Sequence, residues 1–117
     1  MRILPGFLMA GLLVACDGQP SFDSALWKAD SMTENHQVLK VRQSMSADIQ
    51  RRFPAGTTRT EILKTFGTQE YDARHECDYP GVDNCLGYHL GATTDDYSFL
   101  IFAFRGDRLT HVSILPG

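Results

Sequence analysis

Two cysteines and two histidines lie close enough in the sequence to share one chemical site. Cys77 and Cys85 flank the short loop Asp78–Asn84, and His75 and His89 stand just outside the two cysteines. The two thiols can form a disulfide that closes the loop, or the four side chains can bind zinc, which accepts thiolate and imidazole ligands in a tetrahedron. The spacing matches no common zinc motif, and the cellular compartment decides between the two interpretations.

The first fifteen residues have the pattern of a bacterial export signal. Arg2 supplies a positive charge, residues 3–14 form an apolar run, and Leu13–Cys16 (LVAC) resembles a lipobox, the site of signal peptidase II. The resemblance implies that Cys16 becomes the first mature residue and carries acyl chains such as palmitate. The apolar run is too short to span a bilayer, so we expect a lipid anchor. An ordinary secretory signal with a chance cysteine is the alternative.

Lipidation predicts a location on the periplasmic side of a bacterial membrane, with the lipid bilayer as one partner. Residues 16–21 form a short tether, and Asp17 resembles the inner-membrane retention signal of enteric bacteria. Other bacteria use other sorting positions, so the choice between inner and outer membrane stays open. An exported location favours the disulfide between Cys77 and Cys85, because oxidising compartments preserve such bonds. We therefore expect no bound metal and no cofactor.

The composition predicts one modest domain at residues 22–117, after the signal at 1–15 and the tether at 16–21. The chain has 117 residues, of which 43% are hydrophobic, and its formal charge is −3. Nucleic-acid binding requires a basic surface, so this mild acidity argues against a nucleic-acid partner.

Two helices are predicted from capping boxes. Thr58 and Glu61 begin a short helix that ends at Gly67 and places Ile62 and Phe66 on one face. The pattern at 31–34 (SMTE) begins a longer helix that ends before Pro54. The apolar stripe of the longer helix recurs at steps of three and four residues: Val38, Val41, Met45, Ile49 and Phe53.

After Gly67 the apolar residues alternate as in strands. We predict four strands, around residues 71–77, 86–90, 97–104 and 108–115, with a two-residue turn at Gly106-Asp107. The predicted fold class is α+β, with two helices packed on one face of a three- to four-stranded antiparallel meander sheet.

The predicted turn fixes which side chains share a face. It pairs Phe104 with Leu109 and Phe102 with His111. The face assigned to the core then carries Phe99, Ile101, Ala103, Val112 and Ile114. The opposite face carries a second apolar set: Leu100, Phe102, Phe104 and Leu109. Since two helices cover only one side of a sheet, the second set is either covered by Phe22–Trp27 or open to a protein partner.

The pattern Gly56-x-Thr58-Arg-x-Glu61-Ile-Leu-x-x-Phe66-Gly67, after a lipobox and before a meander, resembles the SmpA/OmlA (BamE-like) small bacterial lipoproteins. The resemblance implies two helices on an antiparallel sheet. Family members of known role are non-enzymatic accessories of outer-membrane protein assembly, which implies an envelope protein as partner.

No side chains in the sequence form a recognisable nucleophile and base, so we predict no catalytic residue and no enzyme. Asp95 and Asp96 are more simply solvated loop charges than paired catalytic carboxylates. Our first hypothesis is a membrane-anchored, non-catalytic protein-binding or scaffold domain that uses the face of Phe102. The alternative is a small inhibitor or immunity-type protein that blocks an envelope enzyme through the disulfide loop, because a stapled loop is preorganised for binding.

Overall fold

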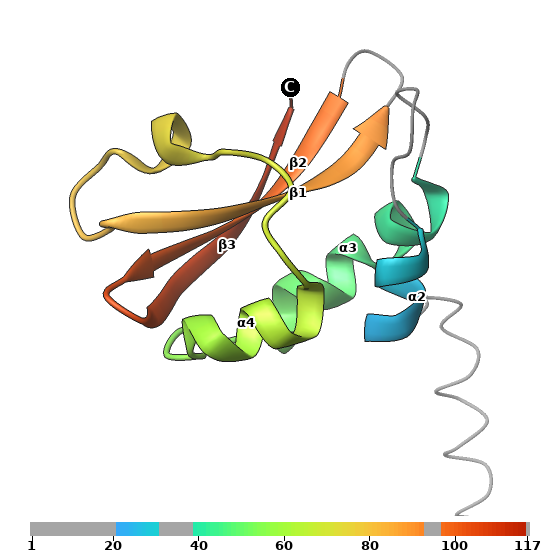
Figure 1. The fold of residues 1–117 in the computed structure, drawn as a ribbon, viewed down its shortest axis with the longest axis horizontal. Coiled ribbons are helices and arrows are strands. Elements are labelled where there is room, and N and C mark those ends of the chain that lie inside the picture. Colours follow the sequence, from blue (N-terminus) through green and yellow to red (C-terminus); the bar gives the residue numbers. More distant parts are fainter. Residues whose placement is uncertain (1–20, 31–38, 93–96, 117) are drawn as a thin grey trace, which may run out of the picture.

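A three-stranded antiparallel sheet with helices on one side forms the domain (Figure 1). The computed structural model describes residues 21–30, 39–92 and 97–116. Consecutive strands are neighbours in the sheet: β1 (Asn84–Ala92), β2 (Tyr97–Arg105) and β3 (Arg108–Pro116). Three helices precede them in the described residues: α2 (Ser24–Ala29), α3 (Lys40–Arg52) and α4 (Arg59–Phe66). The predicted fold class is confirmed.

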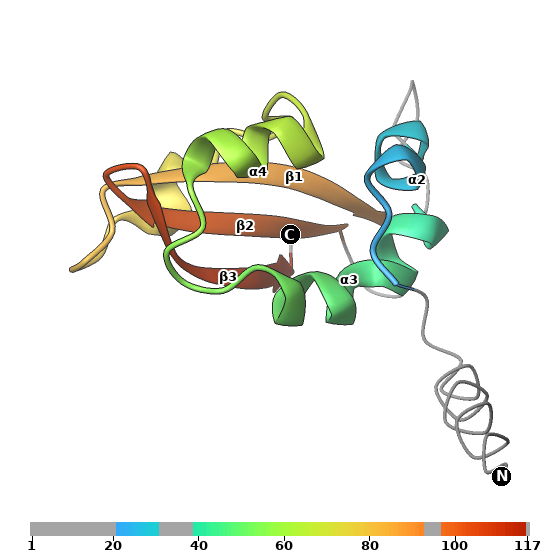
Figure 2. The same cartoon turned by 90° about the horizontal axis from the view of Figure 1, so that it is seen from below.

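The helices α3 and α4 lie on the same side of the sheet, and α2 lies where β1 ends (Figures 1 and 2). No helix within residues 21–30, 39–92 and 97–116 has the length and apolar character that spanning a membrane requires. The predicted signal, lipidation and sorting residues at 1–20, which include Cys16 and Asp17, lie outside the described residues.

The short helix α4 begins and ends at the predicted residues. The Thr58 side chain accepts a hydrogen bond from the Glu61 amide (3.1 Å). Gly67 has a φ of 92°, in the region that favours glycine, and its amide donates to the carbonyl of Leu63 (2.8 Å). The apolar side chains of Ile62 and Phe66 are buried in the core. Local sequence chemistry therefore determines this helix.

The buried face of α3 differs from the predicted stripe. Met45 and Ile49 are buried as expected, but Val41 is 39% exposed and the neighbouring Arg42 is buried instead. The prediction for Val41 is wrong because Arg42 finds buried hydrogen-bond partners, described below. The helix ends at Arg52, before Pro54, as predicted. The predicted start at 31–34 lies outside the described residues.

A β-bulge in β3 reverses the predicted faces of the sheet. Phe104 pairs with Leu109 as predicted, but Phe102 pairs with Val112, one residue later than expected. One extra residue in a strand moves every following side chain to the other face. Val112 and Ile114 therefore join the face of Phe102 and pack against the core.

The face predicted to bind a partner is the core of the domain. Its four proposed contact residues are at most 2% exposed and lie under the helices: Leu100, Phe102, Phe104 and Leu109. The prediction that these four form an open binding surface is wrong, because the bulge places the largest apolar set on their side. Phe66 from α4 packs on Phe102, with ring centroids 4.7 Å apart. The segment around Phe22 and Trp27 packs on the same side, next to Phe66.

The other face of the sheet is covered in part by the segment between α4 and β1, which Figure 1 shows on the side away from α4. Tyr71 stacks on Phe99 (4.1 Å between centroids), and Ala73 is buried. We predicted a strand here. Instead Tyr71 forms a single bridge with Gly87, and the 3-10 helix η1 (Arg74–Cys77) follows.

The chain leaves the edge of β1 at a turn made by Asp72. Its carboxylate accepts hydrogen bonds from the backbone amide of Arg74 (3.2 Å) and from the Arg74 guanidinium (2.7 Å). This local bonding competes with strand pairing and directs the segment across the sheet. The prediction of a fourth strand is therefore wrong.

Candidate functional site

The disulfide between Cys77 and Cys85 joins η1 to the start of β1. The predicted disulfide is therefore present, and the two thiols that a zinc ion would need are bonded to each other. His89 lies against Phe99, with ring centroids 5.7 Å apart, so it does not converge on the sulfur atoms. Within the described part of the chain, no three Cys, His, Asp or Glu side chains gather into a metal site.

The loop that this bond closes is tied to the turn between β2 and β3. The Asp83 amide donates to the carbonyl of Phe104 (2.9 Å), and the Asp83 carboxylate accepts from the Gly106 amide (3.0 and 3.1 Å). The Asn84 side-chain amide donates to the Gly106 carbonyl (2.9 Å) and to Asp83 (2.6 Å). The hydrogen bond from the Asn84 side chain lowers the pKa of Asp83 most, and the bond from the Gly106 amide lowers it further. The Asp83 carboxylate therefore stays charged. These bonds fix the end of the loop against the β2–β3 turn.

Tyr79 projects from this loop over the sheet. Its ring stacks on His111 of β3 (5.7 Å between centroids), and its hydroxyl hydrogen-bonds to Nε2 of His111 (2.6 Å). The other ring nitrogen of His111 bonds to the Thr110 hydroxyl (3.0 Å). Tyr79 is nevertheless 38% exposed. Partial burial of the Tyr79 side chain raises its pKa, so the hydroxyl stays neutral. The loop thus presents a rigidly held aromatic side chain.

An open groove of about 750 Å³ runs beside the loop. Its walls carry charges of both signs: Arg59, Asp72, Arg74, Asp78 and Asp83. Arg74 is paired with Asp72, and the Nε of Arg59 donates to the Asn84 side chain (3.0 Å). A groove of mixed charges suits polar recognition of another surface. It is not the apolar enclosure that small-molecule sites use.

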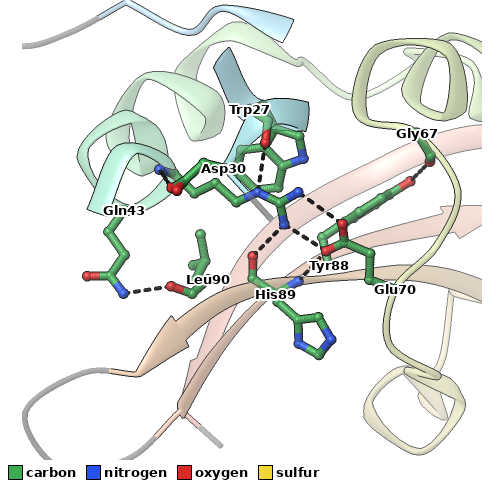
Figure 3. A network of polar contacts seen from close by, with 9 residues as sticks. Trp27, Asp30, Gln43, Gly67, Glu70, Tyr88, His89 and Leu90 are labelled. Carbon is green, nitrogen blue, oxygen red and sulfur yellow. Dashed lines mark hydrogen bonds and ion pairs between the residues drawn. The ribbon is translucent and has the colours of Figure 1, made fainter. Parts of the chain in front are cut away.

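A second polar cluster lies inside the domain, around Arg42, which is buried. Figure 3 labels its partners Trp27, Glu70 and His89. Its guanidinium donates to the Glu70 carboxylate (2.7 and 2.9 Å) and to the carbonyls of Trp27 and His89 (both 3.0 Å). It also lies 4.2 Å from the centre of the Trp27 ring. The cluster joins α2, α3, β1 and the segment after α4.

The titratable groups of this cluster, Glu70 and Tyr88, form hydrogen bonds within the domain. Burial opposes ionisation of Glu70, but the hydrogen bonds from Arg42 and the His89 amide outweigh it, so the pKa of Glu70 is lowered. The Tyr88 hydroxyl donates to the Gly67 carbonyl (2.8 Å), and burial raises its pKa. The sequence alone does not predict this cluster. The available signal was the position of Arg42, three and seven residues before the buried Met45 and Ile49.

No family model, curated protein or solved structure matches this chain. The resemblance to the SmpA/OmlA lipoproteins therefore stays a prediction. The structure brings Cys77 and Cys85 together, while Asp95 and Asp96 lie outside the described residues.

Proposed function

We propose that this chain is a lipid-anchored, non-catalytic domain of the bacterial cell envelope that binds another protein through the loop 78–84. One observation carries the proposal: Tyr79 is 38% exposed although its loop is fixed by the disulfide and by bonds to the β2–β3 turn. Tyrosine is enriched at the energetic centres of protein interfaces, and a fixed loop loses little conformational entropy on binding.

The lipid anchor rests on the sequence of residues 13–16, with Cys16 as the acylated residue. The disulfide between Cys77 and Cys85 supports an oxidising compartment such as the periplasm. Changing Cys16 to Ala should move the protein from the membrane fraction to the soluble periplasmic fraction. The mass of the mature N-terminal peptide should lose the acyl chains. A variant whose signal is cleaved but that stays on the membrane contradicts the anchor.

The resemblance to SmpA/OmlA lipoproteins supports a partner in outer-membrane protein assembly. A second candidate function, inhibition of an envelope enzyme, is favoured by the same stapled loop, since inhibitory loops act by inserting a rigid segment. The two functions differ in the partner that the loop contacts, so one experiment separates them.

The experiment is photo-crosslinking in living cells from a photoreactive residue at position 79. Leu26, which is 53% exposed, is the control position, because α2 lies at the other end of the sheet (Figure 1). Capture of an outer-membrane assembly protein from position 79 alone supports the scaffold function. Capture of one soluble envelope enzyme supports the inhibitor. Equal capture at both positions, or capture of only a second copy of this chain, overturns the proposed use of the loop.

A further inference from the structure

The two edges of the sheet differ in how their backbone groups are satisfied. Along the outer edge of β1, the Gly87 amide donates to the side chain of Gln69 (3.3 Å), and the His89 amide donates to Glu70 (3.0 Å). Carbonyl groups of this edge accept hydrogen bonds from four residues: Arg42, Gln43, Glu70 and Tyr71. Figure 3 shows the bond from Gln43 to Leu90. These partners close the edge of β1 to any further strand.

The outer edge of β3 is closed only at its start. The Leu109 amide donates to the Thr57 carbonyl (2.8 Å), and the Leu109 carbonyl accepts from the Gly56 amide (2.7 Å). Leu109 thus points its backbone groups away from β2. After the bulge, Val112 and Ile114 occupy the equivalent outward positions in the register. Among the described residues, none bonds to the outward backbone groups of these two.

The open part of β3 lacks the usual protection of an edge strand. Natural edges carry charged residues or proline that block pairing with another chain. From Leu109 to Leu115 the sequence LTHVSIL contains no acidic residue, no lysine, no arginine and no proline. The bulge precedes Val112, so it leaves the stretch from Val112 to Leu115 regular.

We propose that β3 pairs antiparallel with β3 of a second copy of this chain, about a two-fold axis at Ser113. A two-fold interface requires a surface that complements itself. Pairing about Ser113 sets Val112 of each copy beside Ile114 of the other, on the helix side of the sheet. Both side chains are half-buried and β-branched, which is a favourable cross-strand pair.

Charge also permits this pairing. On the far side, Ser113 meets Ser113 of the second copy, and His111 meets Leu115. No like charges stand opposite each other, in contrast to the Arg105–Arg108 pair at the hairpin end. The two sheets would then form one continuous six-stranded sheet. Its two outer edges would be the β1 strands, whose backbone groups are already hydrogen-bonded.

Cysteine crosslinking of the full chain in its membrane tests this register. The backbone groups of Ser113 point toward β2, so Ser113 and Ser113 of the second copy would form a non-hydrogen-bonded pair. The Cα atoms of such a pair are about 4.5 Å apart, within disulfide range. The Ser113→Cys variant should form a disulfide-linked dimer. The Leu115→Cys control should not, because its Cα atoms would be about 13 Å apart across the axis.

A charged variant and a mass measurement complete the test. Ser113→Lys places like charges at the axis and should make the detergent-solubilised full chain monomeric. Its unfolding midpoint in urea should match that of the unmodified chain diluted until it is monomeric, because association itself stabilises the folded state. The unmodified chain should sediment as a dimer. A monomeric unmodified chain, or equal crosslinking at positions 113 and 115, overturns the proposal. If an extended segment of another protein pairs with β3 instead, the purified unmodified chain is monomeric, which overturns the proposal.

Discussion

The guanidinium of Arg42 and the carboxylate of Glu70 make two parallel contacts, at 2.7 and 2.9 Å, although Arg42 is only 1% exposed. A charge removed from water is tolerated only when its partners satisfy it fully. Arg42 achieves this with one carboxylate and two backbone carbonyls. The pair therefore connects α3 to the segment that carries Glu70 and holds that segment against β1.

Replacing Arg42 with Ala should lower the free energy of unfolding by about 3 kcal/mol, since Glu70 loses its buried partner. Lysine should not restore stability, because an ammonium group cannot make the same paired contacts. Urea denaturation measures both variants. The control is Arg51→Ala, whose side chain is 64% exposed and should change stability by less than about 0.5 kcal/mol. Equal stabilities for Arg42→Ala and Arg51→Ala would contradict the assigned role.

The stability of the domain should fall in acid, in part through Glu70. Its folded-state pKa lies below the ordinary value of 4.5, so the unfolded chain takes up the proton first as the pH falls. This contribution is fully present above about pH 4.5 and is lost as the pH drops through the folded-state pKa.

The Glu70→Gln variant isolates this contribution. Its deficit in unfolding free energy relative to the unmodified chain should be largest at neutral pH and shrink in acid. Urea denaturation across this range measures it. Asp48 and Asp83 also have lowered pKa values, so the variant keeps part of the slope. A deficit that is constant with pH would mean that Glu70 acts through packing alone.

Features of the fold that depend on neighbouring residues could be predicted from the sequence. Thr58 and Gly67 determine both ends of α4, and Gly106-Asp107 forms the turn that pairs Phe104 with Leu109. The disulfide could also be predicted, because its two cysteines remain as a pair once Cys16 is assigned to lipid.

Features that depend on distant residues could not be predicted. The bulge lies in β3, opposite Ala103 and Phe104 of β2, and leaves no mark in the alternating sequence, yet it reverses which face is the core. An arginine in a helix is ordinarily expected to face solvent. The burial of Arg42 is explained by distant partners: the Glu70 carboxylate, 28 residues away, and the carbonyls of Trp27 and His89. The candidate binding site differs from the predicted one for the same reason. Phe102 lies in the core, whereas Tyr79 is exposed and can contact a partner.

Changing Phe102 to Ala tests the corrected faces. Its fully buried ring contacts Phe66 and Tyr88, so the variant should lose about 3–5 kcal/mol of stability. Thermal unfolding followed by circular dichroism measures the loss. Leu26→Ala removes an apolar side chain that is 53% exposed and should leave the midpoint nearly unchanged. A folded, stable Phe102→Asp variant would restore the face assignment that the sequence predicted.

Removing the disulfide should weaken the cover on the far face of the sheet. The bond closes a short loop, with a sequence separation of 8, and the chain-entropy relation gives a stabilisation of roughly 2–3 kcal/mol. The Cys77→Ser/Cys85→Ser variant should therefore unfold at lower urea concentration than the oxidised chain. A reductant should shift the unmodified chain toward the variant and leave the variant unchanged.

The same variant separates two ways in which the cover is held. Tyr71 remains bonded to Gly87 and stacked on Phe99 without the disulfide, whereas η1 is tied to β1 through Cys77. Limited proteolysis should consequently cut the variant after Arg74 faster than after Arg59, which lies at the start of α4. Equal cutting rates at the two sites would indicate global unfolding, and would show that the disulfide stabilises the whole domain instead of this segment.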